Sequence, residues 1–250
     1  MSRIDKALME KLSVAVVIPV FNEEKYLKAC LDALSRQTLL PDIVFIVDNN
    51  STDTSVSIAS EYRFVNVVRE PHQGICAATK HGLDRAAMKF DLLLRCDADC
   101  RPEKDWIEKV VVAFAKRKNT VAVTGPGIVY DAPATGRVLF DWFYMKPYFF
   151  FVGLALKRKP LFGSNFAIRS STWSEVSSRT HLSDYQDIHD DIDISYHLPM
   201  EGLIEYERTL RMPISARPFK SVSKMGARYK AGFKSIFLHW PEQAPWKIRP

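Results

Sequence analysis

The sequence lacks any run of about 18 uncharged apolar residues, the length that a membrane-spanning helix needs. Its nearest approach is the segment 138–156, which Asp141, Lys146 and Pro147 interrupt. Residues 1–13 are charged and contain no apolar core of the signal-peptide kind. We therefore predict no transmembrane helix and expect a cytoplasmic location.

Cysteine is scarce, and it does not occur at metal-binding spacing. The four cysteines are Cys30, Cys76, Cys96 and Cys100, and none forms a CxxC pair. We expect reduced thiols, as is usual in the cytosol. Zinc-finger spacing, an RNA-binding signature and a recognition-helix pattern are also missing, and a net charge of +6 is too small to indicate nucleic acid alone. We predict no nucleic-acid partner.

The composition is that of an ordinary globular protein, with 47% hydrophobic and 26% charged residues. A Gly/Ser-rich linker, an internal repeat and a low-complexity segment are all absent. We therefore predict a single domain over residues 1–250, although the pattern changes near residue 124.

Apolar, β-branched runs alternate with segments of helical periodicity from about residue 14 to residue 124. The predicted strands are 14–18, 43–47, 65–68, 92–99 and 121–123, and the fourth ends in Asp97 and Asp99. Asn22 is expected to cap the first helix, and Pro102 to start the fourth. This alternation predicts an α/β protein with a layered sheet, in which ligands bind outside the carboxyl ends of the strands.

Three polar loops follow predicted strands, at 21–23, 48–53 and 97–99. Asp97 and Asp99 are two residues apart, so on an extended backbone their carboxylates point the same way. Such carboxylates repel each other unless a cation lies between them, and oxygen ligands suit Mg²⁺ or Mn²⁺. An ordinary turn after a strand is the alternative interpretation of this pair.

The second half is rich in aromatic residues between 129 and 161, and Lys157, Arg158 and Lys159 follow them. Three interpretations remain open for this segment. It forms part of the core, with a solvated basic turn; it contacts an anionic membrane surface; or its rings stack on sugars. A strand is expected at 204–210, and the tail after Arg217 is basic and aromatic.

Several motifs in order resemble the inverting nucleotide-sugar glycosyltransferases of family 2. They are Val17-Ile18-Pro19-Val20-Phe21-Asn22-Glu23-Glu24, the segment from Val47 to Asp53, Gly74 with Ala78 and Gly82, Cys96-Asp97-Ala98-Asp99, the segment from Gly163 to Arg169, and Asp190-Asp191-Ile192-Asp193. The resemblance implies the GT-A fold, a three-layer sandwich with a central, mostly parallel sheet flanked by helices. It also implies a nucleotide-sugar-binding half at about 13–124 and an acceptor-binding, catalytic half at about 125–217, followed by the tail 218–250.

The resemblance implies roles for the first half. Donor-binding positions would be Pro19, Val20, Phe21, Glu23, Asp48, Asn50, Lys80, Asp97 and Ala98. Glu23 would accept hydrogen bonds from ribose hydroxyls, and Asp48 would contact the nucleobase. Asp97 and Asp99 would hold a divalent ion, Mg²⁺ or Mn²⁺, that clamps the diphosphate. Lys80 would contact the diphosphate, and a solvated helix lysine is the equal alternative.

Inverting transfer needs one base that takes a proton from the acceptor hydroxyl. The resemblance assigns Asp191 as this base and gives Asp190 a supporting role near the acceptor. Gly163, Ser164 and Asn165 would form the turn beside the acceptor. The alternative for the two aspartates is simple capping of a helix, whose N-terminus favours carboxylates.

The sequence departs from the family where many members have a late histidine as the third metal ligand. Arg217 occupies the comparable place, and a cation does not ligate a metal. Either the third protein ligand is absent, or Arg217 contacts phosphate.

The function expected is transfer of a sugar, from a UDP-sugar by preference, to a hydroxyl on a glycan or lipid-linked glycan, with peripheral contact at the inner face of the membrane. A sugar-nucleotide-binding module without catalysis and a nucleotidyltransferase are the alternatives.

Overall fold

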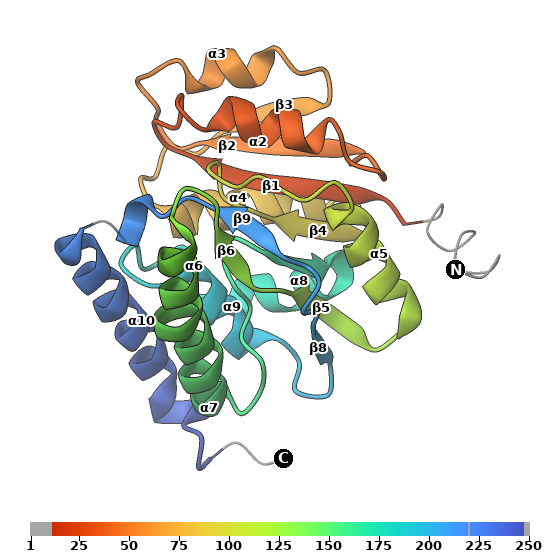
Figure 1. The fold of residues 1–250 in the computed structure, drawn as a ribbon. Coiled ribbons are helices and arrows are strands. Elements are labelled where there is room, and N and C mark those ends of the chain that lie inside the picture. The colour runs from red at the N-terminus through yellow and green to blue at the C-terminus, as the bar shows by residue number, and fades with distance from the viewer. Residues whose placement is uncertain (1–11, 220, 248–250) are drawn as a thin grey trace.

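The computed structural model of the chain describes residues 12–219 and 221–247, and its centre is a seven-stranded sheet (Figure 1). The strands are β1 Val14–Val20, β2 Ile43–Asp48, β3 Val65–Arg69, β4 Leu92–Arg95, β5 Thr120–Thr124, β7 Phe166–Arg169 and β8 Leu203–Tyr206. Their spatial order is β3-β2-β1-β4-β7-β5-β8, and β7 alone among them runs antiparallel to its two neighbours. A short parallel pair, β6 Gly127–Val129 and β9 Met212–Ile214, forms a second sheet.

Helices cover both faces of the large sheet. They are α2 Leu27–Leu34, α3 Ser55–Ser60 and α5 Trp106–Lys116 on one face, and α4 Ile75–Ala87, α8 Ser170–Val176 and α9 Asp190–His197 on the other. Successive side chains of a strand point to opposite faces. In β1, Val16 accordingly packs in the first core and Val17 in the second, and both are fully buried. This arrangement confirms the predicted α/β sandwich with a mostly parallel sheet.

The strand order reverses between β1 and β4, because β2 and β3 continue on one side of β1 while β4 lies on the other. In open α/β sheets the crevice at such a reversal, beyond the carboxyl ends of the strands, is where ligands bind. The predicted loops 21–23 and 97–99 lead out of these two strands. Helix α4 packs closely against β1, since a Cβ atom on Gly82 would lie 2.3 Å from Val17 Cγ1.

The aromatic segment forms a helical rod made of α6 Ala134–Phe140, two π-helical turns at Asp141–Met145 and Tyr148–Val152, and α7 Gly153–Leu156. Pro147 lies between the two π turns and has no N–H to donate, which accounts for the irregular hydrogen bonding there. The C-terminal helix α10, Val222–Gln243, lies beside this rod (Figure 1). Side chains of the two elements line a common apolar cavity.

Several local predictions are wrong. Asn22 does not cap a helix: α2 begins at Leu27, and Asn22 has a φ of 54° and accepts a hydrogen bond from the Thr52 backbone. Helix α5 begins at Trp106, later than Pro102, and the strand expected to reach residue 210 ends at Tyr206.

Two broader expectations can also be compared with the structure. All four cysteines are free thiols and are buried. In the part of the chain that is described, every helix is too short or too polar to cross a bilayer.

Candidate functional site

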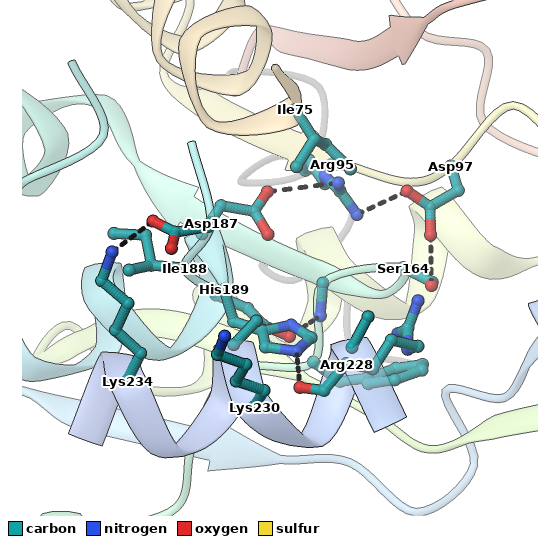
Figure 2. A pocket seen from close by; sticks show the side chains of 16 residues that line it. Ile75, Arg95, Asp97, Ser164, Asp187, Ile188, His189, Arg228, Lys230 and Lys234 are labelled. Carbon is teal, nitrogen blue, oxygen red and sulfur yellow. Dashed lines mark hydrogen bonds and ion pairs between the residues drawn. The ribbon is translucent and has the colours of Figure 1, made fainter. Parts of the chain in front are cut away.

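Two adjoining cavities open at the carboxyl edge of β1 and β4. One has a volume of about 430 Å³ and the other about 320 Å³, and we call them the larger and the smaller cavity. Ile75, Asp97 and Arg228 line both, so the two form neighbouring compartments of one site. Figure 2 shows the larger cavity, to which β4, α9 and α10 contribute side chains.

The smaller cavity gathers most of the residues that the sequence assigns to the donor. Pro19, Val20, Phe21, Glu23, Asp97 and Ala98 line it, together with Asp99 and Arg217. Glu23 Oε2 is buried and has no hydrogen-bond partner among the described residues. One carboxylate oxygen of this cavity-lining residue is therefore unpaired.

Three predicted donor residues do not line this cavity. Asp48 ends β2 and accepts a hydrogen bond from the backbone of Ser51, and Asn50 donates one to the carbonyl of Pro71. Lys80 lines a different cavity and forms an ion pair of 2.7 Å with Asp84. Asn49 and Gln73, which have no role assigned from the sequence, line the smaller cavity instead.

Arg95 connects the two halves of the site. It ends β4, is 1% exposed, and contacts Asp97 Oδ1 at 2.8 Å and Asp190 Oδ2 at 3.1 Å (Figure 2). Ser164 Oγ donates to Asp97 Oδ2, and Thr79 Oγ1 donates to Asp190. Burial opposes ionisation of Asp97, but Arg95 and Ser164 outweigh it, so the pKa of Asp97 lies below its usual range.

Asp99 lies in a different electrostatic setting. Burial and the charge of Asp97 raise the pKa of Asp99 to about 7, even though Arg217 Nε contacts Asp99 Oδ2 at 3.1 Å. Arg217 also forms an ion pair with Glu23 through Nη2. The predicted phosphate-contacting arginine therefore lies among the carboxylates of the smaller cavity.

Asp97 and Asp99 fit the requirements of a hard cation. Their carboxylates and the Cys100 thiol each place one atom within 4.8 Å of the others. Burial raises the pKa of Cys100 well above its usual range, so this residue remains a neutral thiol. Two carboxylates that repel each other are a suitable seat for Mg²⁺ or Mn²⁺, and substrate phosphates commonly complete the shell of such ions.

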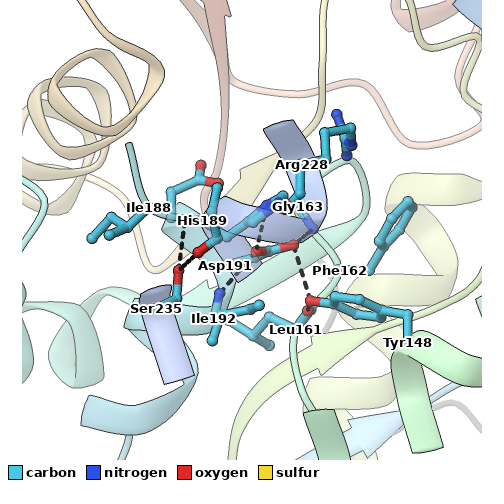
Figure 3. Close-up of polar contacts among 12 residues, drawn as sticks. Tyr148, Leu161, Phe162, Gly163, Ile188, His189, Asp191, Ile192, Arg228 and Ser235 are labelled. Carbon is cyan, nitrogen blue, oxygen red and sulfur yellow. Dashed lines mark hydrogen bonds and ion pairs between the residues drawn. The ribbon is translucent and has the colours of Figure 1, made fainter. Parts of the chain in front are cut away.

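Asp191 is the second residue of α9 and lines the larger cavity. Its Oδ2 accepts a hydrogen bond of 2.6 Å from the Gly163 backbone and lies 3.1 Å from the Tyr148 hydroxyl (Figure 3). Its Oδ1 accepts from the Ile192 backbone and lies 3.8 Å from His189 Nδ1. Burial raises the pKa of Asp191, which makes the carboxylate a stronger base than a solvated aspartate.

The turn at 163–165 is divided between the cavity and the core. Gly163 and Ser164 line the larger cavity, and a Cβ atom on Gly163 would lie 3.1 Å from Asp191 Oδ2. Asn165 is fully buried, where it donates to the Leu210 carbonyl and accepts from Trp106 Nε1. Its predicted acceptor contact is wrong, because its side chain holds core segments together.

Several residues of the site have no role assigned from the sequence, among them Arg95, Tyr148, His189 and Arg228. Arg95 carried a signal, since an arginine in an apolar strand is buried only where carboxylates compensate it. His189 directly precedes the predicted Asp190 and Asp191. Tyr148 and Arg228 gave no local signal, because the rod and α10 bring them to the site from distant parts of the chain. Arg228 Nη2 donates to the Tyr144 hydroxyl, and its buried Nε has no partner among the described residues.

Known proteins with a similar sequence are glycosyltransferases by name. The chain is 32% identical to the putative glycosyltransferase EpsH of Bacillus subtilis over 104 residues, which are 40% of this chain and 28% of the relative. It is 30% identical to the glycosyltransferase AglE of Haloferax volcanii over 123 residues, 46% of this chain and 38% of the relative. The matched regions thus span less than half of either relative.

Solved structures share the fold at low sequence identity. Glucosyl-3-phosphoglycerate synthase of Mycobacterium tuberculosis, in complex with Mn²⁺, UDP and glucosyl-3-phosphoglycerate, matches with a TM-score of 0.63 at 18% identity, over 94% of this chain and 82% of that one. S. aureus TarS in complex with UDP matches with a TM-score of 0.64 at 15% identity, over 93% and 66% of the two chains. The sequence model of glycosyl transferase family 2 matches residues 15–172, more than half of the chain. The chain belongs to glycosyl transferase family 2.

Proposed function

We propose that the protein transfers a sugar from a nucleoside diphosphate sugar, by preference a UDP-sugar, to an acceptor hydroxyl with inversion at the anomeric carbon. The observation that carries this proposal is the pair of adjoining cavities, with Asp97 lining both and the buried Asp191 lining the larger one. Direct displacement needs the leaving diphosphate and the base on opposite sides of the sugar. The two compartments would provide such an arrangement, because Asp191 lines the larger cavity and not the smaller one.

The smaller cavity would bind the nucleotide. Phe21 offers an apolar ring to the nucleoside, and the unused Glu23 Oε2 accepts hydrogen bonds from ribose hydroxyls. The preference for uridine is supported by the UDP found in both similar structures described above. Asp48 and Asn50 flank Asn49, which lines the cavity, and they would contact the nucleobase beside it.

Asp97 and Asp99 would hold the divalent ion. When bound, the ion supplies Lewis-acid stabilisation of the negative charge on the departing diphosphate. Arg217 contacts Asp99, one of these two carboxylates, and its guanidinium would also bind phosphate oxygens. Arg228, with its unpaired Nε, lies between the two cavities and adds a second cation there.

Asp191 would act as the base. The Gly163 amide and the Ile192 amide orient its two oxygens, and burial keeps its proton affinity high. The acceptor hydroxyl would give its proton to Asp191 as its oxygen attacks the anomeric carbon. Asp190, held by Arg95 and Thr79, supports this geometry and does not take the proton.

The acceptor that best suits the larger cavity is a lipid-linked glycan. Lys230 and Lys234 line this cavity and favour an anionic group such as a phosphate. An apolar cavity of about 330 Å³ between the rod and α10 adjoins it at His189 and Arg228, and would take part of a lipid chain. Exposed aromatic side chains on the same two elements, Trp142, Phe143, Phe150, Phe233 and Phe237, would contact the bilayer surface.

The experiment that tests the function is donor turnover with a panel of UDP-, GDP- and dTDP-sugars, with Mg²⁺ or Mn²⁺, and with polyprenyl-phosphate-linked glycans as acceptors. We expect release of UDP and a product of inverted anomeric configuration, both observable by NMR. Binding of UDP-sugar without any turnover would favour the binding-module alternative. Release of pyrophosphate from a sugar phosphate and UTP would favour a nucleotidyltransferase.

Membrane contact needs a separate test. Binding to vesicles of anionic phospholipid is expected to exceed binding to neutral vesicles, and replacing Trp142 and Phe143 by serine should reduce it. Equal vesicle binding by the double variant and the wild type would mean that the rod does not contact the membrane.

A further inference from the structure

Three histidines and one aspartate converge behind the active site, at a place that neither cavity reaches. His181 precedes α9, Asp193 and His197 lie on α9 four residues apart, and His239 lies on α10. One donor atom of each, His181 Nδ1, Asp193 Oδ1, His197 Nε2 and His239 Nε2, lies within 4.8 Å of all the others. Half of the six histidines of the chain are gathered here.

The distances between these donor atoms resemble the edges of a tetrahedron. Asp193 Oδ1 lies 2.9 Å from His181 Nδ1, 3.2 Å from His239 Nε2 and 3.7 Å from His197 Nε2. His197 Nε2 lies 3.4 Å from both His181 Nδ1 and His239 Nε2. A tetrahedral zinc ion with bonds of about 2.0–2.1 Å separates its ligands by about 3.3–3.4 Å.

Hydrogen bonding to His239 leaves the inward nitrogen available. Its Nδ1 lies 2.7 Å from the carbonyl of Ser235, an acceptor, so Nδ1 carries the proton. In the neutral imidazole, Nε2 then has a lone pair, and it faces the carboxylate oxygen of Asp193 at 3.2 Å. Two acceptors at this distance repel each other, and a cation between them removes the repulsion.

The surroundings of the cluster resemble the outer shell of a metal site. The backbone carbonyl that fixes the His239 tautomer is a common partner of metal-bound imidazoles. Asp193 is fully buried, and its second oxygen accepts a hydrogen bond of 2.9 Å from the His181 backbone. The Tyr196 ring stacks on His239 with centroids 4.1 Å apart, which holds the imidazole in place. His181 is partly exposed and offers a route for an ion to enter.

We propose that His181, Asp193, His197 and His239 bind a structural divalent transition-metal ion, with Zn²⁺ as the best fit to three imidazoles and one carboxylate. Four protein ligands close the shell, so the ion has no open position for a substrate and stabilises the fold without reacting. This site is distinct from the pair Asp97 and Asp99, whose oxygen ligands suit Mg²⁺ or Mn²⁺.

The ion would connect the two helices that carry active-site residues. Helix α9 begins with Asp190 and Asp191, and α10 carries Arg228. Since His197 and His239 lie on different helices, a shared ion joins α10 to α9 directly. Loss of the ion should loosen α10 first, and Arg228 would move with it.

The first test is the metal content of protein purified without a polyhistidine tag, measured by inductively coupled plasma mass spectrometry after dialysis against metal-free buffer. We expect stoichiometric zinc in the wild type and a several-fold lower content in His239→Gln. The matched control is His72→Gln, which removes an exposed histidine paired with Glu70 and should keep the zinc. Wild-type protein without transition metal, and unable to take up added Zn²⁺, would overturn the proposal.

Two further measurements cover the case in which His239→Gln does not fold. Replacement of zinc by Co²⁺ in the wild type should give the intense visible absorption of a tetrahedral cobalt site, and His181→Gln, at the partly exposed ligand, should weaken it. A strong chelator should lower the melting temperature of the wild type, and Zn²⁺ in excess should restore it. A melting temperature that depends on pH but not on zinc would mean that protons alone hold the cluster together, which contradicts the proposal.

Discussion

The site contains two acidic pairs that are built in the same way in different places. Asp97 and Asp99 follow the strand β4, whereas Asp190 and Asp191 begin the helix α9. In each pair one carboxylate contacts Arg95, at 2.8 Å for Asp97 and 3.1 Å for Asp190. The other carboxylate of each pair, Asp99 or Asp191, has a raised pKa.

The two carboxylates of each pair are therefore suited to different roles. The member that touches Arg95 is neutralised and held in place, so it can orient its neighbours. The other member is buried and has a raised pKa, so it binds a cation or a proton more readily than a solvated carboxylate does. Asp99, beside another carboxylate, is suited to a metal ion, and Asp191, held by amides and near Tyr148, is suited to a proton.

The largest effect is expected from Asp191→Asn. The amide keeps the shape but cannot accept the proton of the acceptor, so kcat should fall by roughly 10²–10⁴-fold, the usual contribution of a general base. UDP binding, measured by calorimetry, should stay unchanged because Asp191 does not line the smaller cavity.

The matched control for this variant is Asp187→Asn. Asp187 lines the same cavity, but it is exposed and paired with Lys234, so turnover should change little. Normal turnover by Asp191→Asn would mean that another residue is the base, and that the two acidic pairs do not have parallel roles.

Arg95→Met should chiefly reduce stability. Removing one partner of a buried ion pair leaves uncompensated charges, here Asp97 and Asp190, and costs about 3–5 kcal/mol of unfolding free energy. Urea denaturation measures this loss. Arg85→Met, at an exposed position of α4, should change the same free energy by less than about 0.5 kcal/mol. Equal stability of the two variants would show that Arg95 does not anchor the pairs.

The pKa of Asp99 predicts a pH dependence of stability in metal-free buffer. Its value is about 7 in the folded chain and close to about 3.9 in the unfolded chain, so between these values the folded state binds more protons. Stability should therefore fall as the pH rises from about 4 to about 7, by on the order of 2 kcal/mol after allowance for the coupling to Asp97.

Urea denaturation at pH 5 and pH 8 with a chelator measures this effect. Asp99→Asn cannot titrate, so its stability should decline less between the two pH values than that of the wild type. An identical decline in both proteins would assign the titration to another group. Added Mn²⁺ should reduce the decline in the wild type alone, since the ion replaces the proton between the carboxylates.

The fold of the first half of the chain can be predicted from the sequence because local sequence patterns determine its strands and loops. Buried strands such as 14–18 are continuous apolar runs, and the loops that follow them reach the same sheet edge through the parallel topology. Glu23, Asp97 and Asp99 lie in or next to these loops, and all three line the smaller cavity. The predicted acceptor contact of Asn165 is wrong, because a polar residue in a turn gives no sign of whether its amide meets solvent or, as here, the core.

The contacts of the second half are harder to predict from the sequence because they depend on how distant helices pack. Tyr148 reaches Asp191 across 43 residues, and Arg228 approaches the site from a helix that the sequence showed only as a basic, aromatic tail. Asp193 has no individual role assigned from the sequence, and in the structure it is fully buried among three histidines. The spacing of Asp193 and His197, one helical turn apart, was the local signal, and His181 and His239 join them only through tertiary packing.

The smallest effect is expected at Lys80, which sequence reasoning placed on the diphosphate. Its ammonium pairs with Asp84 one turn along α4, and such pairs contribute about 0.3–0.5 kcal/mol. Lys80→Ala should therefore change the unfolding free energy by no more than this amount and leave the affinity for UDP within about twofold, since 1.4 kcal/mol is needed for a tenfold change. Arg228→Ala, which removes the cation between the two cavities, is the variant that should weaken UDP binding. A tenfold loss of UDP affinity in Lys80→Ala, measured by calorimetry, would contradict this expectation. It would mean that Lys80 leaves Asp84 and binds the diphosphate when the donor is present. The smaller cavity would then use a side chain that changes its partner, whereas Asp191 in the larger cavity is held by backbone amides.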